Sequence, residues 1–597
     1  MRKKSYLYPN KKLILKKKEN LVRKYNKFIE EYVINKNLPV FFLGCFFILV
    51  GSIVPLAVFS YLQREDPAYL WDWGAYFGMY QHFGDLIRNQ DQWMRDLLRS
   101  VSEDDYNLLP ISFLAPFSIV FHDSRFGYIC GISIFYLIPA AFMLAICSIS
   151  SKRYSNFSLE EGRGISYFLV CFVVSLEFHP FWIPTLRGLP DVAGIIPLGL
   201  ASLVLMKSKF LSKFSWLSIV LFSIMAWLTF AMRRWYAFSV VSMISISFFI
   251  TFLYALKSLD RRKAFINFFL SYTVSCFIIS ALLFLFQRSL VVRILSTSYQ
   301  EAYIAYQKPF SISLQIIENI YGIFYTILFV FGLLLSIKNK NVSVIFCALS
   351  AILTFLLFTR TQAPGIQHGL PIFFWATIVG IYFILNIASV LHPIARLVLA
   401  IGIIAYGFAA SAIVFFPIMQ SNLGNFAFML PAQRVPPLHV ENMNEYRNMI
   451  SKIKEFTNNG SRFSVFASSP VLADSLLIAF DHSLETNLTG ASQVDARDFM
   501  SLAPLTSAYV VVTDKPITHL NSGSQQVIEI PNNDIIKNQH MGEAYQRVAG
   551  PYSLSDGNRA YIYHRIRPLS DEDIEDLQSQ LNKSYPTWKW NHNGMIQ

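Results

Sequence analysis

The stretch Leu38–Tyr61, LPVFFLGCFFILVGSIVPLAVFSY, runs for 24 residues without one charged side chain. An α-helix needs about 20 predominantly apolar residues to cross the hydrocarbon core of a bilayer. The stretch is too long for the hydrophobic core of a signal peptide, and no clear small-residue cleavage site follows it. We interpret it as an uncleaved transmembrane anchor.

The composition of the whole chain agrees with this interpretation. Of 597 residues, 54% are hydrophobic and only 15% are charged, whereas soluble globular proteins carry about 25% charged residues. This composition also excludes a disordered chain and a coiled coil. Ten further apolar blocks follow the first, at residues 126–150, 164–183, 191–206, 215–232, 235–256, 264–286, 315–337, 341–359, 369–390 and 394–417. The sequence predicts an α-helical polytopic membrane protein with about eleven transmembrane helices.

The basic residues of the chain predict its orientation. Residues 1–37 hold twelve Lys or Arg directly before the first span, which favours a cytoplasmic N-terminal segment that contacts anionic lipid over a nucleic-acid site. With that segment inside, short basic loops also fall inside. Their residues are Lys152, Arg153, Arg163, Lys207, Lys209, Lys213, Lys257, Arg261, Arg262, Lys263, Lys338, Lys340 and Arg396. The 14-residue stretch Leu108–Phe121 is interpreted as an interfacial or re-entrant helix, because a full crossing there would invert this pattern.

The remaining charges gather on the predicted outer side, in at least six separate loops. They include Asp66, Asp72, Glu103, Asp104, Asp105, Glu177, His179, Arg187, Asp191, Arg233, Arg234, Arg288, Arg293, Glu318, Arg360 and His368. Ionisable groups at membrane depth are costly and tend to face a cavity or a partner. The set predicts one polar cavity that opens outward, although any single member is more simply a loop charge. All six cysteines lie in apolar blocks, so neither a disulfide framework nor a Cys-rich metal site is expected outside the membrane.

The sequence predicts a transmembrane domain at residues 38–417, which includes a first outer loop at 62–125. The last part of the chain, residues 418–597, is predicted to be a soluble domain. Helices are expected at 440–456, 470–480 and 571–583, and strands at 462–467, 507–513 and 559–564. This pattern predicts a small extracytoplasmic α/β domain. It contains no glycine-rich phosphate loop, metal spacing or nucleophile elbow. Its expected role is to bind an acceptor or cover the cavity mouth, with a purely structural cap as the alternative.

Short motifs in the outer loops come in a defined order. The first is Trp71-Asp72-Trp73-Gly74-Ala75-Tyr76, the second is Asp105-Tyr106-Asn107-Leu108-Leu109-Pro110, and the third is Arg187-Gly188-Leu189-Pro190-Asp191. The chain thereby resembles the GT-C superfamily of membrane glycosyltransferases, which includes protein O-mannosyltransferases and the aminoarabinose transferases that modify lipid A. The resemblance covers about residues 38–417. It departs from the family pattern in two places, since the usual Asp-Glu pair is Asp72-Trp73 and the paired prolines appear as Asn107-Leu108-Leu109-Pro110.

The resemblance implies a glycosyltransferase that uses a polyprenyl-phosphate sugar, has interfacial helices in its first outer loop and inverts the anomeric carbon. Asp72 is the candidate general base, with a solvated loop acid or helix cap as the alternative. Guanidinium groups suit the donor phosphate because their planar fork meets two oxygens. The candidates for that phosphate are Arg233, Arg234, Arg360 and His368. The candidates for sugar or acceptor binding are Trp71, Tyr76, Glu103, Asp104, Asp105, Arg187 and Asp191.

No metal site is assigned, although the three consecutive acids leave a divalent cation open. The expected partners are the bilayer, a lipid-linked donor and a glycan, lipid or protein acceptor. The expected location is a bacterial inner membrane, with the C-terminal domain in the periplasm. Two alternatives remain: a flippase or transporter for lipid-linked oligosaccharides, for which no convincing repeat is visible, and a polysaccharide polymerase or ligase, which typically has a dominant late outer loop.

Overall fold

The computed structural model describes residues 35–89, 91–153, 164–416 and 428–590. The chain divides into two units, Met1–Ser60 and Tyr61–Gln597. In the first unit the described part is α2 (Asn35–Leu62), whose last two residues belong to the second unit. A helix over 38–61 is therefore confirmed. The basic segment at 1–37 lies almost wholly outside the described residues.

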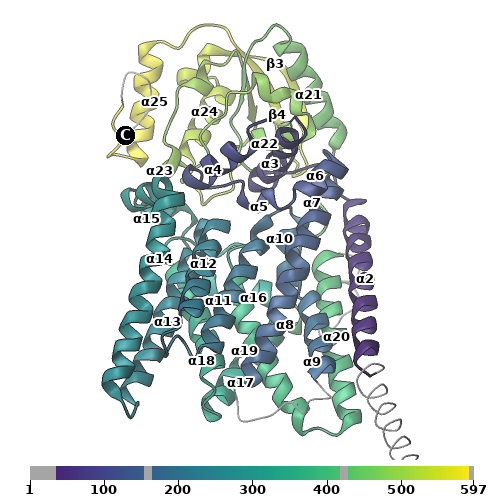
Figure 1. Cartoon of the computed structure of the whole chain (residues 1–597). Coiled ribbons are helices and arrows are strands. Elements are labelled where there is room, and N and C mark those ends of the chain that lie inside the picture. The colour runs from purple at the N-terminus through teal and green to yellow at the C-terminus, as the bar shows by residue number, and fades with distance from the viewer. Residues whose placement is uncertain (1–34, 90, 154–163, 417–427, 591–597) are drawn as a thin grey trace, which may run out of the picture. The chain divides into compact units, whose positions relative to one another are not determined.

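The second unit contains a bundle of long apolar helices (Figure 1). Among the described residues, six are long and apolar enough to cross a membrane: Arg125–Lys152, Pro190–Lys207, Arg234–Leu256, Arg261–Ser296, Leu370–Val390 and Pro393–Phe415. Three shorter apolar helices lie at Ile48–Leu62, Trp216–Met232 and Val342–Phe358. Each coincides with a predicted span. The count of eleven crossings and their orientation stay predictions, because these helices are identified by length and composition alone.

Two further predicted spans are bent. The helices α9 (Gly164–Leu176) and α10 (His179–Leu186) meet at 43°. The helices α16 (Phe310–Tyr321) and α17 (Ile323–Lys338) meet at 102°. The predicted span at 315–337 is therefore either a broken span or a re-entrant segment, and its crossing of the membrane stays a prediction. The chain turns at Gly322, whose φ of +87° suits a residue without a Cβ.

Three helices form the wall of the membrane domain that matters for the site. They are α12 (Trp216–Met232), α13 (Ala237–Leu256) and α14 (Arg261–Ser296). The last is longer than the predicted span at 264–286, and non-helical backbone angles interrupt it at Gln287. The indole of Trp227 donates to the Gln287 side chain at 3.1 Å, so α12 supports the interruption.

The first outer loop is helical. It contains α3 (Trp71–Arg88), α4 (Trp93–Glu103), α5 (Leu109–Ser112) and α6 (Ala115–Phe121). The predicted helix at 108–121 is thus two short helices, neither of which is long enough to cross a bilayer. Of these, α6 packs against both α3 and α7 (Arg125–Ile132).

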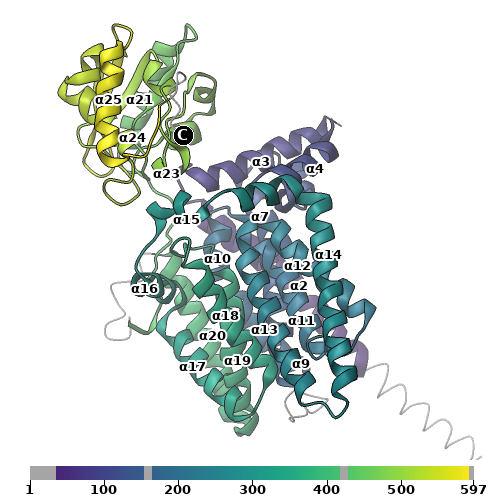
Figure 2. The same ribbon diagram turned by 90° about the vertical axis from the view of Figure 1, so that its left-hand side faces the viewer.

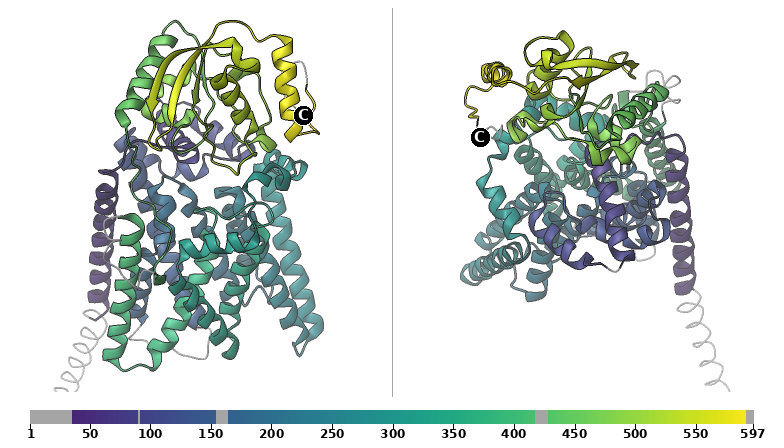
Figure 3. Two further views of the ribbon diagram at one scale, coloured as in Figure 1. Left: turned by 180° about the vertical axis from the view of Figure 1, so that it is seen from behind. Right: turned by 90° about the horizontal axis from the view of Figure 1, so that it is seen from above.

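The C-terminal domain is built on a four-stranded sheet with the order β1-β2-β4-β3 (Figure 3). The strands are β1 (Phe463–Val465), β2 (Tyr509–Thr513), β3 (Tyr545–Ser553) and β4 (Arg559–Arg565). β1 and β2 are parallel, and the other pairs are antiparallel. The helices are α21 (Met443–Thr457), α22 (Asp474–Phe480), α23 (Asp495–Asp498), α24 (Gln526–Lys537) and α25 (Asp571–Ser584). The expected α/β architecture is present, although β3 and α24 were not expected.

Both faces of this sheet are covered by helices. Val511 of β2 packs with residues of α21 and α22, whereas its neighbours Val510 and Val512 pack with residues of α24 and α25. This follows from the strand period of two, which turns successive side chains to opposite faces. Ser570 and Asp573 form a capping box that starts α25.

The first of these two cores extends into the segment before α3. Ala68 and Leu70 are buried in it at 4% and 2% exposure, and Trp71 and Trp73 pack against it. The backbone N–H of Asp66 also donates to the carbonyl of Leu438 at 2.7 Å. The C-terminal domain therefore fixes the position at which α3 begins.

Candidate functional site

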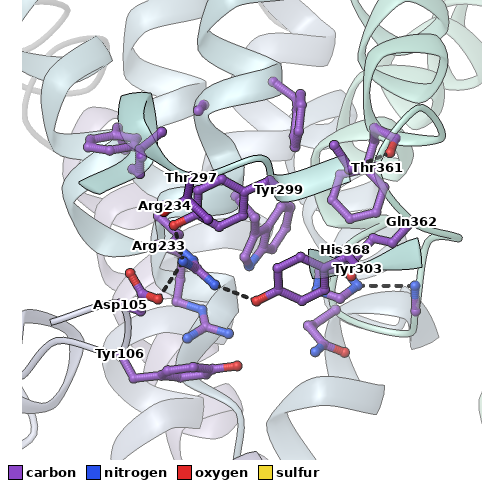
Figure 4. Close-up of a pocket in the computed structure, with 18 of the residues that line it drawn as sticks. Asp105, Tyr106, Arg233, Arg234, Thr297, Tyr299, Tyr303, Thr361, Gln362 and His368 are labelled. Atoms are coloured by element: carbon purple, nitrogen blue, oxygen red, sulfur yellow. Dashed lines mark hydrogen bonds and ion pairs between the residues drawn. The ribbon is translucent and has the colours of Figure 1, made fainter. Parts of the chain in front are cut away.

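One large cavity is lined by half of the site residues predicted from the sequence: Trp71, Asp72, Asp105, Arg233, Arg234 and His368. Its volume is about 1070 Å³. One end is polar and is lined by the first outer loop, the α12–α13 turn, the segment 297–306 and the C-terminal domain. The other end is apolar and lies among α12, α13 and α14. Figure 4 shows part of the polar end.

Asp72 lies in the first turn of α3 and lines the polar end. Burial raises the pKa of its carboxyl, while nearby Arg233 and a hydrogen bond from Tyr106 act in the opposite direction. A carboxylate with a raised pKa is a better proton acceptor when it is ionised. Asp72 therefore presents a proton acceptor to the cavity, and its catalytic role stays a prediction.

Arg233 ends α12 and is held from two sides. Its Nε donates to the Asp191 carboxylate at 2.9 Å, and its Nη1 donates to the Tyr76 hydroxyl. Asp191, in the short helix η3 (Pro190–Gly194), also accepts from the Trp235 indole at 2.9 Å. Arg233 and Asp191 are 5% and 0% exposed. A buried ion pair of this kind fixes the arginine in one position at the cavity wall.

Arg234, the next residue, contacts a different set of side chains from Arg233 (Figure 4). Its Nη1 lies 2.5 Å from the Asp105 carboxylate and donates to the Tyr299 hydroxyl at 2.8 Å. Its Nη2 donates to the Tyr303 hydroxyl at 2.7 Å. Asp105 also pairs with Arg293 at 2.9 Å. The Arg233-Arg234 dipeptide thus presents two guanidinium groups with separate supports.

His368 lines the same cavity, between the rings of Trp235 and Phe358. Burial and the two neighbouring arginines lower its pKa to about 3, so the imidazole is neutral at neutral pH. Its Nδ1 accepts from the backbone N–H of Gly365 at 3.1 Å, which leaves the proton on Nε2. His368 can therefore donate a hydrogen bond to a phosphate oxygen, but it brings no positive charge.

The apolar end of the cavity is continuous with the polar end. Its lining residues are Ala226, Trp227, Phe230, Ala237, Phe238, Val240, Val241, Ile244, Ile279, Leu283, Val291, Ile294, Leu295 and Phe358. Val241 and Leu295 are 52% and 81% exposed, so this end opens on the outer surface of the helices. An open apolar groove beside fixed charges suits an amphipathic ligand.

The C-terminal domain closes the cavity on the side of α3. Gln493, Arg497 and His519 line it. The Trp71 indole donates to Gln493 at 3.0 Å, and its ring lies 4.7 Å from that of His519. Figure 2 shows α23 next to α15 (Tyr299–Ala302). The predicted role of this domain as a cover for the cavity is consistent with these contacts.

Several predicted site residues lie elsewhere. Tyr76 and Asp191 are buried behind the cavity wall, where they hold Arg233. Glu103 and Asp104 do not line the cavity, and Arg360 is exposed on the surface outside it. Direct contact of these side chains with a substrate stays a prediction, and none of them lines the cavity.

Arg187 belongs to a second buried cluster. Its Nη2 donates to the carbonyl of Pro436 at 2.8 Å, its Nη1 lies 3.9 Å from Glu65, and its carbonyl accepts from Arg125 at 3.0 Å. Arg125 also donates to the carbonyl of Trp73 at 3.4 Å. Arg187 therefore connects the linker to the start of α3, and it does not line the cavity.

Sequence reasoning missed several lining residues: Tyr299, Tyr303, Tyr306, Gln493, Arg497 and His519. Tyr299 and Tyr303 are four residues apart, a spacing that places two side chains on one helix face. That spacing was an available signal, whereas the residues of the C-terminal domain belong to no motif. Within the described residues, no three His, Cys, Asp or Glu side chains are grouped to hold a metal ion.

Comparisons with known proteins give little more. No protein-family model matches this sequence, and no curated protein matches it. Among solved structures, the chain is similar to ArnT from Cupriavidus metallidurans, crystallised with bound undecaprenyl phosphate. The identity is 10% and the TM-score 0.43, over 86% of this chain and 98% of that chain. A likeness at this identity and TM-score assigns neither residues nor substrates to this chain.

Proposed function

We propose that this protein is a membrane glycosyltransferase that moves a sugar from a polyprenyl-phosphate donor to a cell-envelope acceptor on the outer face of the membrane. The single observation that carries the proposal is the continuity of the cavity. A half-buried carboxylate, two arginines and an apolar groove share one space. Each of these three parts suits one part of the reaction.

The carboxylate of Asp72 is the proposed base. It removes the proton of the acceptor hydroxyl as that oxygen attacks the anomeric carbon of the donor sugar. The bond from this carbon to the phosphate oxygen breaks, and its electrons leave with the phosphate. A positioned base contributes typically 10²- to 10⁴-fold to such a step. A single displacement inverts the anomeric carbon.

The arginines stabilise the leaving phosphate. Arg234 is the better placed of the two, because its side chain is 16% exposed against 5% for Arg233. Both are held by carboxylates before substrate arrives. Fixed charges of this kind stabilise developing negative charge without reorganising during the reaction.

The groove among α12, α13 and α14 holds the polyprenyl chain. Burial of apolar surface contributes roughly 25 cal/mol per Å², so a long chain in this groove adds affinity. The groove also orients the donor, since it places the lipid on one side of the arginines and the sugar on the side of Asp72. The proposal includes the expected location, which is a bacterial inner membrane with the C-terminal domain in the periplasm.

The direct test is a transfer assay with the full-length protein in proteoliposomes. Polyprenyl-phosphate donors with radiolabelled sugars are supplied with envelope glycolipids, glycans and proteins as acceptors. We expect label to move to an acceptor and free polyprenyl phosphate to accumulate in equal amount. Movement of labelled lipid across the bilayer without any transfer would overturn the proposal and favour a flippase.

A further inference from the structure

The C-terminal domain contributes one arginine, Arg497, to the cavity lining. This residue belongs to none of the sequence motifs and lies outside the membrane domain. Arg497 lies in α23 and lines the polar end, together with Arg233 and Arg234. Among the described residues, these three are the arginines of the cavity lining. They differ in how much of each guanidinium is already engaged.

The two arginines of the membrane domain are extensively engaged. Arg233 donates through Nε and Nη1 to Asp191 and Tyr76. Arg234 contacts Asp105 and Tyr299 through Nη1, and it donates to Tyr303 through Nη2. A substrate anion that approaches either one must share or displace one of these partners.

Arg497 is arranged differently. Its Nε and Nη2 donate to the two oxygens of Asp498, at 2.6 and 2.9 Å. Within the described part of the chain, its Nη1 makes no hydrogen bond, and its side chain is 42% exposed. One edge of the guanidinium is therefore held in place by Asp498, while the other remains available to a ligand. A guanidinium group that is already oriented loses less conformational freedom when it binds a ligand than a freely moving one does.

The backbone that carries Arg497 is itself fixed. The Asp495 carboxylate accepts from the backbone N–H of Gln526 at 2.6 Å and from the Tyr585 hydroxyl at 2.5 Å. The Asp498 carboxylate also accepts from the backbone N–H of Val494 at 3.1 Å. These bonds tie α23 to the start of α24 and the end of α25. Arg497 thus extends into the cavity from α23, whose position is fixed by these hydrogen bonds.

The neighbours of Arg497 form an aromatic wall. The rings of Trp71 and His519 lie 4.7 Å apart, and the Tyr306 hydroxyl is 3.3 Å from His519 Nε2. Burial lowers the pKa of His519, so this ring adds no positive charge. Arg497 also interacts electrostatically with Tyr303, Tyr306 and Asp72. An open guanidinium edge beside aromatic rings suits an anionic group attached to a sugar.

We propose that Arg497 binds a phosphate or carboxylate group of a substrate, which makes the C-terminal domain part of the substrate site. This deepens the proposed transferase function and rests on it. The anion has two sources, the phosphate of the lipid-linked donor and an anionic group on the acceptor. Both offer the planar pair of oxygens that a guanidinium recognises.

The test measures binding to the full-length protein in detergent, with two probes. Undecaprenyl phosphate represents the donor lipid, and glucosamine 6-phosphate represents a phosphorylated saccharide without a tail. The variants are Arg497→Gln and Arg497→Lys. The control is Arg547→Gln, since Arg547 is an exposed residue of β3 outside the cavity.

Arg497→Gln is expected to weaken the binding of one probe about tenfold, which corresponds to about 1.4 kcal/mol. Arg547→Gln is expected to leave the affinity for both probes unchanged. Arg497→Lys is expected to recover part of the loss, because it restores charge but not the fork. Weaker binding of undecaprenyl phosphate would identify the donor phosphate as the ligand of Arg497. Weaker binding of glucosamine 6-phosphate would identify an anionic group of the acceptor. If Arg497→Gln melts like wild type and binds both probes as wild type does, the inference is overturned. It is also overturned if the wild type binds neither probe.

A transfer assay on the same preparations separates this inference from the proposed function. Wild-type binding that depends on Arg497 without any sugar transfer would contradict the transferase proposal alone. Sugar transfer with unchanged kinetics in Arg497→Gln would contradict the role of Arg497 alone. A raised KM at little altered kcat is the kinetic result expected for a binding residue.

Discussion

Asp191 and Arg233 form a buried ion pair, with 2.9 Å between the carboxylate Oδ1 and the guanidinium Nε. The pair joins η3 to the end of α12, so residues 42 positions apart in the chain fix one wall of the cavity. Removal of one partner from a buried pair leaves the other as an uncompensated charge. This relationship leads to the first prediction.

Asp191→Ala is expected to destabilise the protein by about 3–5 kcal/mol, the usual cost of breaking a buried pair from one side. Asp85→Ala is the matched control, because Asp85 pairs with Arg88 at 2.5 Å but is 54% exposed. Exposed pairs contribute about 0–1 kcal/mol. Thermal unfolding in detergent measures both variants. Equal melting temperatures would show that the Asp191–Arg233 pair does not support the fold.

Asp72→Asn is expected to lower transfer by about 10²- to 10⁴-fold, because the amide cannot accept the proton of the acceptor hydroxyl. Its folding should be unimpaired or improved. Burial raises the pKa of Asp72, which means that the ionised carboxylate costs folding free energy above that pKa. An uncharged amide removes this cost.

The measurements for Asp72→Asn are therefore a rate and a melting temperature. Asp85→Asn is the control, since Asp85 is on the same helix and does not line the cavity. Loss of sugar transfer with an unchanged or raised melting temperature supports the assignment of Asp72 as the general base. Wild-type turnover in Asp72→Asn would exclude it.

The helices of this protein could be predicted well from its sequence, for a simple physical reason. A crossing helix needs an uninterrupted apolar run, and all the described predicted spans are helical. The bend at Gly322 could not be predicted, because this residue lies inside such a run. The observed feature is local, since the backbone of Gly322 has a φ of +87°, outside the helical region.

The candidate site could be predicted only in part. Asp72, Arg233 and Arg234 were identified because charges next to apolar spans stand out. Arg497 and His519 were not, because in a soluble domain such residues are ordinary surface groups until the fold brings them to the cavity. Arg187 and Asp191 were predicted to bind substrate, since sequence patterns cannot separate a buried charge that supports a site from one that lines it.

Tyr106→Phe is expected to move the acidic limb of the pH profile of kcat/KM to higher pH. The Tyr106 hydroxyl donates a hydrogen bond to Asp72, which favours the ionised carboxylate and lowers its pKa. Without this bond the pKa of Asp72 rises, so a higher pH is needed to keep the base deprotonated. A hydrogen bond to a charged group corresponds to a shift of about one pH unit.

The control for this prediction is Tyr299→Phe. Tyr299 lines the same cavity but accepts from Arg234, so its removal should leave the acidic limb in place. An acidic limb that moves equally in both variants, or in neither, would show that Tyr106 does not set the protonation of the base.

Leu283→Trp is expected to raise the KM for donors with long polyprenyl chains several-fold, with a smaller effect on short-chain analogues. Leu283 of α14 lines the apolar end of the cavity, and an indole there fills space that the lipid needs. Two residues further on, Leu285 is 71% exposed and does not line the cavity. Leu285→Trp therefore adds the same bulk to the lipid-facing side of the same helix and should leave KM unchanged. Donors of graded chain length measure the effect in both variants. The same KM at every chain length in Leu283→Trp and wild type would place the polyprenyl chain outside this groove, because a lipid that occupies it must contact the added ring.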